Sequence, residues 1–363
     1  EKILNAIKNI YKEPKFRVKK GAQKSEYRNQ EAGIRQGCPL SPYLFTIVMN
    51  VLFKDVKSRT NTKKMNEPIE GIKFNEILYA DDTQLIGTNT ANLNRLIKEI
   101  QVESEYYNLA LNYDKCENLT INRETANVKF KAGNLIKRTK KSVYLGAIIT
   151  ERNDNITEIQ NRITECNITA NKLKLFWNKS KKPVKWKIIV YDAVIRSKLL
   201  YGLETMELTN AQIDKLNAFQ MKGHRRILGI PPTFIDRTWT NKRVKEEIEN
   251  QTKKPYRTFS EQWNKSKLNL LGHVLRSSKD NPLYQVCFEQ FSQIPRMVTK
   301  RRAGKPRMNW LDNSLKQAYE IITKEENEQD REDFDLNNDK HIFKIRDRAK
   351  ERKEPFSTKP KPK

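Results

Sequence analysis

Two adjacent carboxylates, Asp81 and Asp82, are the residues of this sequence with the clearest capacity for chemistry. Neighbouring side chains on a strand point to opposite faces, so two adjacent acids can act together only where the chain turns. Apolar runs at 77–80 and 85–86 predict the two arms of a hairpin with the acids at its tip. Carboxylates held together need a cation, and Mg²⁺ prefers hard oxygen ligands and leaves room for phosphate groups. A solvated turn is the alternative interpretation.

A glycine-containing loop, residues 33–42, precedes this hairpin in the sequence. Its two glycines, one of them Gly37, let the backbone approach a ligand closely. Arg35 and Gln36 can contact phosphate and base. The serine and proline at its end are typical of a helix N-cap and first turn, and they predict a helix over 41–57. A loop before a well-capped helix, with no ligand, is the alternative.

The elements that would position these residues can be read from apolar spacing and from turn residues. Helices are expected at 3–11, 41–57 and 92–109, and strands at 15–20, 25–32, 117–121, 127–131 and 142–150. After residue 151 the pattern becomes helical, with helices expected at 153–177, 183–201 and 210–228. The fold class is therefore α+β, with an antiparallel sheet and helices in residues 1–150. From residue 324 onward, charged runs with few apolar residues predict disorder.

The charge of the chain points to polyanions. Lys and Arg number 71 against 44 acidic residues, which gives a net charge of +27. Such a field favours nucleic acid or an acidic membrane, although a codon bias toward Lys and Asn would produce a similar composition. No apolar run is long enough to span a membrane, so no membrane partner is expected. Four cysteines without a metal-binding spacing indicate free thiols in an intracellular setting.

The two motifs together resemble the sequence blocks of reverse transcriptases in their LINE-type, or non-LTR retrotransposon, form. GIRQGCPLSPYLF at 33–45 is similar to motif B of that family, and LYADDTQL at 78–85 is similar to motif C. Segments at 199–205, 225–230, 271–276 and 304–307 also resemble that lineage, so the resemblance covers about residues 1–320.

The resemblance implies a role for each matching residue. Asp81 and Asp82 would be catalytic ligands of Mg²⁺ in a two-ion site, and Tyr79 would lie near the primer end. Gln36 and Gly37 would lie near the template and the incoming nucleotide, with Arg35 beside them. LNYDK at 111–115 resembles motif D, whose Lys115 would neutralise or protonate the departing pyrophosphate. Leu145 and Gly146 match the primer grip. The expected partners are an RNA template, a DNA primer and deoxynucleoside triphosphates.

The resemblance also implies an organisation of the chain. Residues 1–150 would be a partial palm, 151–232 a helical thumb, 233–323 a basic helical region, and 324–363 a disordered tail. A third carboxylate, in motif A, would precede the first residue, together with the fingers and an endonuclease. Asp55 follows motif B and is on the wrong element to replace it. The metal site is therefore expected to be incomplete, and the chain taken alone is expected to be inactive.

Basic residues beyond the hairpin predict contacts with nucleic acid. Lys181, Lys182 and Lys185 lie close to Trp177 and Trp186, and basic side chains beside aromatic ones suit a strand that stacks. A solvated helix face over two core tryptophans is the alternative. Lys300, Arg301 and Arg302 form a denser run that can bind RNA or direct nuclear import. The location is expected to be the nucleus or the cytoplasm.

Three interpretations therefore remain open. The first is an RNA-directed DNA polymerase segment of a retrotransposon. The second is a non-catalytic nucleic-acid-binding remnant that keeps the thumb and the basic tail, and the third is a decayed element with no selected function.

Overall fold

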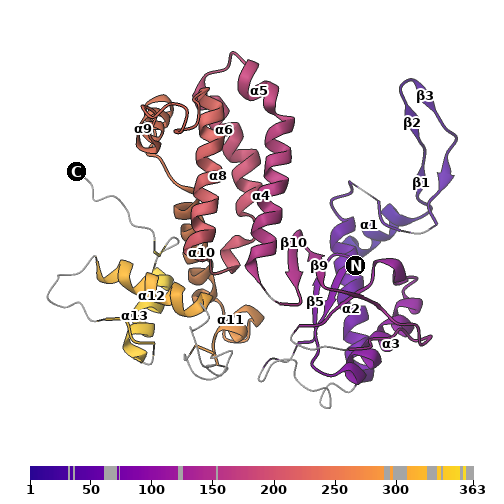
Figure 1. Cartoon of the computed structure of the whole chain (residues 1–363). Coiled ribbons are helices and arrows are strands. Elements are labelled where there is room, and N and C mark those ends of the chain that lie inside the picture. Colours follow the sequence, from indigo (N-terminus) through magenta and orange to yellow (C-terminus); the bar gives the residue numbers. More distant parts are fainter. Residues whose placement is uncertain are drawn as a thin grey trace. The chain divides into compact units, whose positions relative to one another are not determined.

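The computed structural model describes residues 1–31, 33–35, 37–60, 72, 74–121, 126–152, 154–289, 295–296, 309–324, 333–336, 338–351 and 355–356. The chain divides into two compact units, which are described separately below (Figure 1). The N-terminal unit comprises Glu1–Pro68, Asn75–Cys116 and Asn127–Ile136, and the helical unit comprises Ile69–Phe74, Glu117–Ala126 and Lys137–Lys363.

The N-terminal unit has three helices, three small antiparallel pairs of strands and a 3₁₀ turn within its described residues. Its elements are α1 (Lys2–Tyr11), β1 (Lys15–Phe16), β2 (Lys19–Lys20), β3 (Gln23–Lys24), β4 (Arg28–Asn29), α2 (Ser41–Thr60), β5 (Glu76–Tyr79), β6 (Asp82–Leu85), α3 (Thr90–Tyr106) and η2 (Tyr113–Lys115). Strand β1 pairs with β4, β2 with β3, and β5 with β6.

The core of this unit lies where α2, α3 and the β5–β6 hairpin meet. Leu52, Phe53 and Val56 of α2 pack with two buried residues of α3, and Leu78 and Leu85 of the hairpin pack against this cluster. A second small cluster forms around Ile97, Val128 and Phe130. The hairpin is thus held through alternate residues, as expected for a half-buried strand pair.

The helical unit begins with short strands and continues as packed helices. Its strands are β7 (Glu117–Leu119), β8 (Lys137–Thr139), β9 (Lys141–Tyr144) and β10 (Ala147–Thr150). Strands β7 and β8 are parallel, and β9 and β10 form an antiparallel hairpin. Its helices are α4 (Asn155–Lys172), α5 (Lys174–Lys179), α6 (Val184–Tyr191), the π-helix η3 (Asp192–Arg196), α7 (Ser197–Leu200), the 3₁₀ helix η4 (Leu203–Thr205), α8 (Asn210–Leu228), α9 (Asn241–Thr252), α10 (Phe259–Arg276), α11 (Pro282–Cys287), α12 (Trp310–Thr323) and α13 (Asp339–Glu351).

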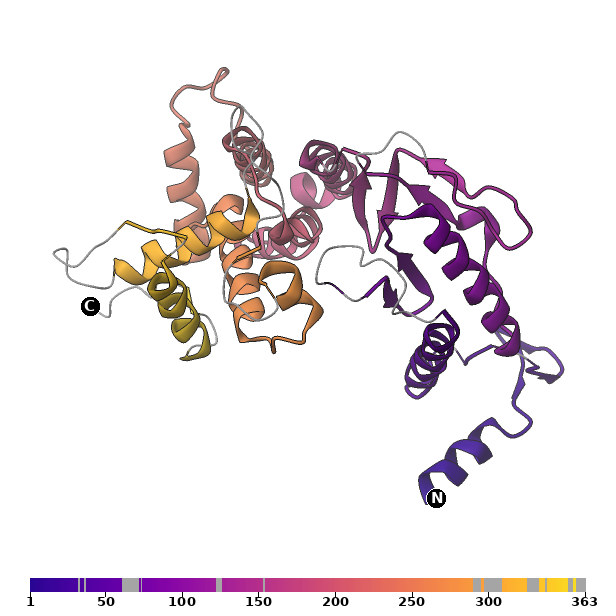
Figure 2. The same ribbon diagram turned by 90° about the horizontal axis from the view of Figure 1, so that it is seen from below.

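Two apolar cores stabilise this unit. The first joins α4, α5, α6, α8, α9 and the start of α10 around Trp177, Tyr191 and Leu199, and Figure 1 shows α4, α6 and α8 running side by side. The second joins the end of α10 to α11, α12 and α13 around Leu271 and Leu315. Helices α12 and α13 pack together, as Figure 2 shows.

Local sequence signals explain where several helices begin and end. Thr209 caps α8 in a capping box with Gln212, and Gly229 ends the helix at a φ of 71°. This helix has the predicted bounds. The helix predicted over 183–201 contains the π-helical segment η3, and the helix predicted over 153–177 is divided at Leu173 into α4 and α5. Residues 127–131 form no strand, only a bridge between Lys129 and Leu135.

The predicted disorder from residue 324 is wrong for Asp339–Glu351, which forms α13. Charged residues are frequent in this helix, but Ile342, Ile345 and Ala349 recur on one face and are buried in the second core. The apolar stripe was too sparse to stand out against the charge. The remaining predicted tail mostly lies outside the described residues.

The mixed α+β class agrees with the structure. The compact units do not follow the predicted limits at 150 and 232, because β9 and β10 belong to the helical unit and the first core extends from Ile159 to Trp263. The division into palm, thumb and basic C-terminal region stays a prediction. Among the described helices, none combines the length and apolar character needed to cross a bilayer.

Candidate functional site

Asp81 and Asp82 lie at the exposed tip of the β5–β6 hairpin. Tyr79 is the cross-strand partner of Asp82, so Ala80 and Asp81 form a two-residue loop. Ala80 has a φ of 52°, a left-handed conformation that is uncommon for a residue other than glycine. The structure therefore has the predicted hairpin with the paired acids at its turn, and both carboxylates face solvent.

The hairpin is fixed to α2 on one face and open on the other. Leu78 and Leu85 point into the core, while Tyr79 is 63% exposed on the face that it shares with Asp82. At the base of the hairpin, Glu76 forms an ion pair with Lys57 in the last turn of α2. The base of the hairpin is therefore anchored, while its tip is exposed.

Carboxylate oxygens are ligands that Mg²⁺ prefers. The hairpin supplies only two such carboxylates, and both come from the same element. Within the described ranges, no third acidic, histidine or cysteine side chain joins them in a metal-binding cluster. Asp55, considered above as a substitute, accepts a hydrogen bond of 2.6 Å from the Tyr107 hydroxyl and so links α2 to the chain after α3. Its carboxylate serves the packing of the two helices.

The loop at 33–42 enters the same helix α2 that holds the hairpin. Gly33 and Gly37 have φ values of 82° and 85°, which explains why glycine is needed at both positions. The guanidinium of Arg35 donates to the Ile10 carbonyl oxygen at 2.9 Å and lies over the Tyr11 ring. Arg35, expected to reach a nucleotide, here connects the loop to α1, and Gln36 lies outside the described residues.

The N-terminus of α2 lowers the pKa of the Cys38 thiol to about 7. A hydrogen bond from the Ser41 side chain is the largest cause, followed by backbone N–H groups of Leu40 and Ser41. Ser41 is fully buried and also bonds to the Tyr11 hydroxyl at 2.8 Å. Unpaired N–H groups at a helix start favour an anion, so this end of the loop is electropositive.

Lys115 lies on the 3₁₀ turn η2, which is docked on α3. Asn112 caps the turn by accepting from the Lys115 backbone N–H, and the Tyr113 hydroxyl accepts from Gln101 at 2.9 Å. The Lys115 ammonium is exposed. No ion pair in the described part of the chain joins Lys115 to Asp81 or Asp82, and the role of Lys115 stays a prediction.

Leu145 and Gly146 form the loop of the β9–β10 hairpin in the helical unit. Both have positive φ values, 48° and 78°, as a two-residue type I′ turn requires. Their carbonyl oxygens are held from outside the hairpin. The Tyr201 hydroxyl donates to Leu145 O at 3.1 Å, and Arg162 donates to Gly146 O at 2.7 Å.

A buried ion pair supports the same turn. Glu158, 1% exposed, binds Arg162 within helix α4 and accepts from the Ile148 backbone N–H at 2.9 Å. Arg162 also lies over the ring of Tyr201. Sequence reasoning missed Glu158 and Arg162, whose i, i+4 spacing was the available signal. Tyr201 was noticed only as part of a segment similar to the family.

The basic residues around α5 and α6 divide into exposed and structural ones. Lys181, Lys182 and Lys185 are exposed, as is Trp186 at 59%, and we call these four residues the α5–α6 patch. Trp177, in contrast, is buried and donates to the Ala170 carbonyl oxygen. Trp177 is therefore a core residue and Trp186 is not, and binding of nucleic acid by the patch stays a prediction. Lys300, Arg301 and Arg302 lie outside the described residues.

Residues 1–149 match the model of the reverse transcriptase (RNA-dependent DNA polymerase) family. The chain is also similar to the RNA-directed DNA polymerase from mobile element jockey of Drosophila melanogaster, with 25% identity over 240 residues, which is 62% of this chain and 25% of that protein. The Drosophila funebris protein of the same name is 25% identical over 252 residues, 63% of this chain and 25% of its own length.

A third relative is the Retrovirus-related Pol polyprotein from type-1 retrotransposable element R2 of Nasonia vitripennis. It is 26% identical over 117 residues, 32% of this chain and 11% of that protein. The chain thus spans about a quarter of the jockey proteins that it matches. The matches agree with the resemblance found in residues 33–45 and 79–82, and the chain is similar to the reverse transcriptases of non-LTR retrotransposons.

Proposed function

We propose that this chain contributes the metal-binding hairpin and part of the nucleotide site of an RNA-directed DNA polymerase. The observation that carries the proposal is the exposed tip of the β5–β6 hairpin, where Asp81 and Asp82 stand beside Tyr79. The substrates would be a primed RNA template and deoxynucleoside triphosphates.

Magnesium would be held by Asp81 and Asp82, whose hard oxygen atoms fit this ion. Two bound ions would favour ionisation of the attacking hydroxyl and stabilise charge on the leaving pyrophosphate. The protein would then have to position the reactants. Tyr79 would support the primer end from the outer face of the hairpin.

The loop at 33–42 would position the template and the incoming nucleotide. Gln36 and Gly37 would approach the base pair, and the N–H groups at the start of α2 would favour phosphate. Arg35 uses one donor for Ile10 O and has further N–H groups for a ligand. Lys115 would neutralise or protonate the pyrophosphate.

The Leu145–Gly146 turn would hold the primer strand. Its carbonyl groups are fixed by Tyr201 and Arg162, so the turn is preorganised before a primer binds. We expect Tyr201→Phe to loosen the turn, raising amide hydrogen exchange at residues 145–148. Unchanged exchange would contradict this role for Tyr201.

Metal binding tests the hairpin directly. We expect Mn²⁺, used as a spectroscopic probe for Mg²⁺, to bind residues 1–363 weakly and to lose this binding in Asp81→Asn and Asp82→Asn. Asp214→Asn removes an exposed carboxylate from α8 and is the matched control. Equal binding by the wild type and Asp81→Asn would refute a metal site at the tip.

Primer extension tests the reaction. We infer that residues 1–363 alone do not polymerise, because the hairpin supplies carboxylates from one side only and two ions need ligands from a second element. Incorporation of deoxynucleotides on an RNA template that Asp81→Asn abolishes would overturn this inference. A longer protein containing an upstream acidic strand should incorporate them, and Asp81→Asn should abolish that activity.

Non-catalytic binding of nucleic acid is a second function, favoured by the α5–α6 patch. Three exposed lysines beside an exposed tryptophan suit a single strand that is bound through phosphate contacts and stacking. Binding of a single-stranded RNA should weaken steeply with salt, and a triple Lys181→Ala, Lys182→Ala, Lys185→Ala variant should have a smaller salt slope. An affinity independent of salt would exclude this mode. The run at 300–302 would add to binding or direct nuclear import.

A further inference from the structure

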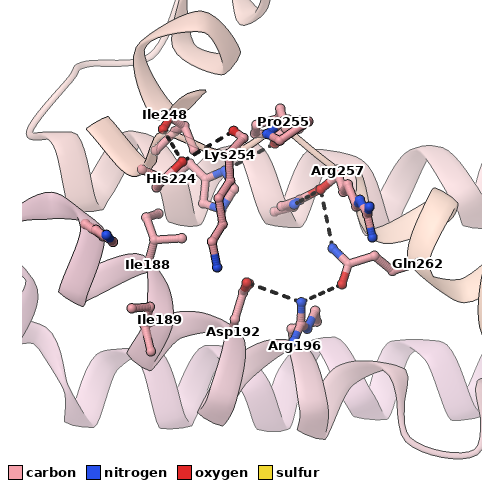
Figure 3. Close-up of a pocket in the computed structure, with 14 residues that line it drawn as sticks. Ile188, Ile189, Asp192, Arg196, His224, Ile248, Lys254, Pro255, Arg257 and Gln262 are labelled. Carbon is pink, nitrogen blue, oxygen red and sulfur yellow. Dashed lines mark hydrogen bonds and ion pairs between the residues drawn. The ribbon is translucent and has the colours of Figure 1, made fainter. Parts of the chain in front are cut away.

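A pocket of about 490 Å³ lies entirely within the helical unit, beside the α5–α6 patch. It is formed by one face of α6 and η3, by α8 and α9, and by the connection to α10 (Figure 3). This volume lies within the roughly 300–1,000 Å³ that is typical of small-ligand sites. No residue of the β5–β6 hairpin or of the Leu145–Gly146 turn lines this pocket.

The walls of the pocket are strongly cationic. Four side chains that carry a positive charge line it, and its only carboxylate among the described lining residues is Asp192; the four are Lys185, Arg196, Lys254 and Arg257. Asp192 is paired with Arg196 at 3.2 Å, and Figure 3 shows Lys254 extending toward the same carboxylate. The surplus positive charge favours an anionic ligand.

A hydrogen-bond network fixes the polar side of the pocket. Arg196 also donates to the Gln262 side chain at 2.6 Å, and Gln262 and Gln220 both donate to the Arg257 carbonyl oxygen. The Arg196 guanidinium is therefore held in one orientation. Asp192 has lone pairs beyond the one that Arg196 uses, and these can accept an amino group from a ligand.

Part of the lining is apolar or aromatic. It consists of Ile188, Ile248, Pro255 and the ring of Tyr256. His224, which also lines the pocket, bonds to the Tyr256 hydroxyl at 3.1 Å and so restrains the phenol ring. A flat, apolar group can thus lie against Tyr256 while its charged part remains near the lysines.

Residues of α6 and of the π-helical segment η3 form one continuous side of the pocket. Lys185, Asp192 and Arg196 all line it, and Asp192 and Arg196 form an i, i+4 ion pair. π-helical segments are rare and are frequently found at functional sites.

We propose that this pocket binds one unpaired nucleotide of a single-stranded nucleic acid, with its base against Tyr256 and its phosphates on the cationic rim. The inference deepens the nucleic-acid binding proposed above for the helical unit. Lys185 belongs to both the patch and the pocket, so a strand lying on the patch can place one nucleotide in the cavity. Unstacked bases of single strands are commonly bound in this way.

Removing the bases tests the proposal without altering charge. Residues 1–363 would be titrated with an oligodeoxycytidine of about twelve nucleotides and with an abasic strand of the same length. We expect the abasic strand to bind roughly 5- to 100-fold more weakly. Equal affinities would overturn the proposal, since phosphate contacts alone would then explain binding.

Three variants locate the effect. Ile189→Trp fills the pocket at a half-exposed lining position and should reduce the ratio of the two dissociation constants by at least about threefold. Lys222→Ala, an exposed lysine outside the pocket, should leave the ratio unchanged. Trp186→Ala reports stacking on the patch. If Trp186→Ala removed the base dependence and Ile189→Trp did not, the base would lie on the patch and the pocket would be excluded.

A cross-linking measurement needs no variant. An oligonucleotide containing 4-thiouridine should cross-link to the peptide with residues 254–257, and excess free cytidine monophosphate should compete only if the pocket also takes mononucleotides. Cross-links restricted to Lys181, Lys182 and Trp186, which are patch residues outside the pocket lining, would contradict the proposal. Binding in the pocket uses no carboxylate of the hairpin, and Asp214→Asn, which removes an exposed carboxylate of α8 outside the pocket, should bind as the wild type does. A failed polymerase assay would therefore leave this test intact.

Discussion

The two units of the molecule differ in how much apolar core supports them. Among the described residues, the clusters of the N-terminal unit contain five and three buried side chains, whereas each core of the helical unit contains fifteen. The N-terminal unit also exposes an apolar stripe on α2, formed by Tyr43 (72%), Ile47 (57%) and Val51 (41%). The unit with the candidate metal ligands therefore has the smaller apolar core, and the unit proposed to bind nucleic acid has the larger one.

The difference in core size predicts in which unit a single substitution should lower stability most. Stability is a small difference between large terms, so a unit with few buried side chains loses a larger fraction with each one. All five tryptophans lie in the helical unit, so intrinsic fluorescence reports on that unit alone. The N-terminal unit has to be followed by hydrogen exchange or proteolysis.

Phe53→Ala should have the largest effect, about 3–5 kcal/mol, because it empties the centre of the five-residue cluster. Hydrogen exchange should rise throughout α2, α3 and the β5–β6 hairpin, while tryptophan fluorescence on urea unfolding should change little. A shift of the fluorescence midpoint as large as the exchange effect would show that the two units unfold together.

Arg162→Met should cost the helical unit about 3 kcal/mol, because it leaves the buried Glu158 carboxylate without its partner. Urea unfolding followed by tryptophan fluorescence measures the loss. Arg152→Met replaces an exposed arginine nearby and should change stability by less than about 0.5 kcal/mol. A loss under about 1 kcal/mol for Arg162→Met would mean that the turn is held by other groups.

Acid should weaken the helical unit through His224. Burial lowers the pKa of His224 from 6.5 to about 4. Because the unfolded chain binds the proton first, this stability is present above pH 6.5 and is lost as the pH falls toward 4. The change is roughly 3 kcal/mol. His224→Gln should unfold with a shallower pH dependence over this range, and an unchanged slope would assign the effect to other groups.

Ile47→Ser should have the smallest effect on folding, within about 0.5 kcal/mol, because Ile47 is exposed on α2. Association of copies through the apolar stripe is expected at high concentration, and Ile47→Ser should reduce it because it interrupts the stripe. Sedimentation and hydrogen exchange measure the two quantities. A loss above about 1 kcal/mol would show that the stripe is covered by this chain itself.

The sequence predicted the parts of the site that depend on local chemistry. The hairpin around Asp81 follows from apolar arms and a short turn, and α8 follows from its caps at Thr209 and Gly229. The π-helix η3, the anchoring of Leu145 by Tyr201, and the pocket around Asp192 depend on residues far apart in the chain. Spacing along a sequence carries no information on such contacts.

Arg35 shows the limit for single residues. Its type and its place in a glycine loop suit a phosphate, yet its guanidinium meets the Ile10 carbonyl and the ring of Tyr11. Both partners belong to α1, and the sequence of the loop alone gives no information about this contact. Lysines at 185 and 187 differ in the same way, because one is exposed and the other donates to the Trp177 carbonyl oxygen from a buried position.

The backbone at Ala80 limits what evolution can place before the two acids. At a φ of 52°, a β-branched side chain would clash with its own backbone, whereas alanine, glycine or asparagine fits. An Ala80→Val protein would retain both carboxylates, but the altered turn would change their positions. A substitution at a residue without any reactive group can therefore disrupt the hairpin turn. The sequence would still contain both aspartates, although they would no longer be positioned together.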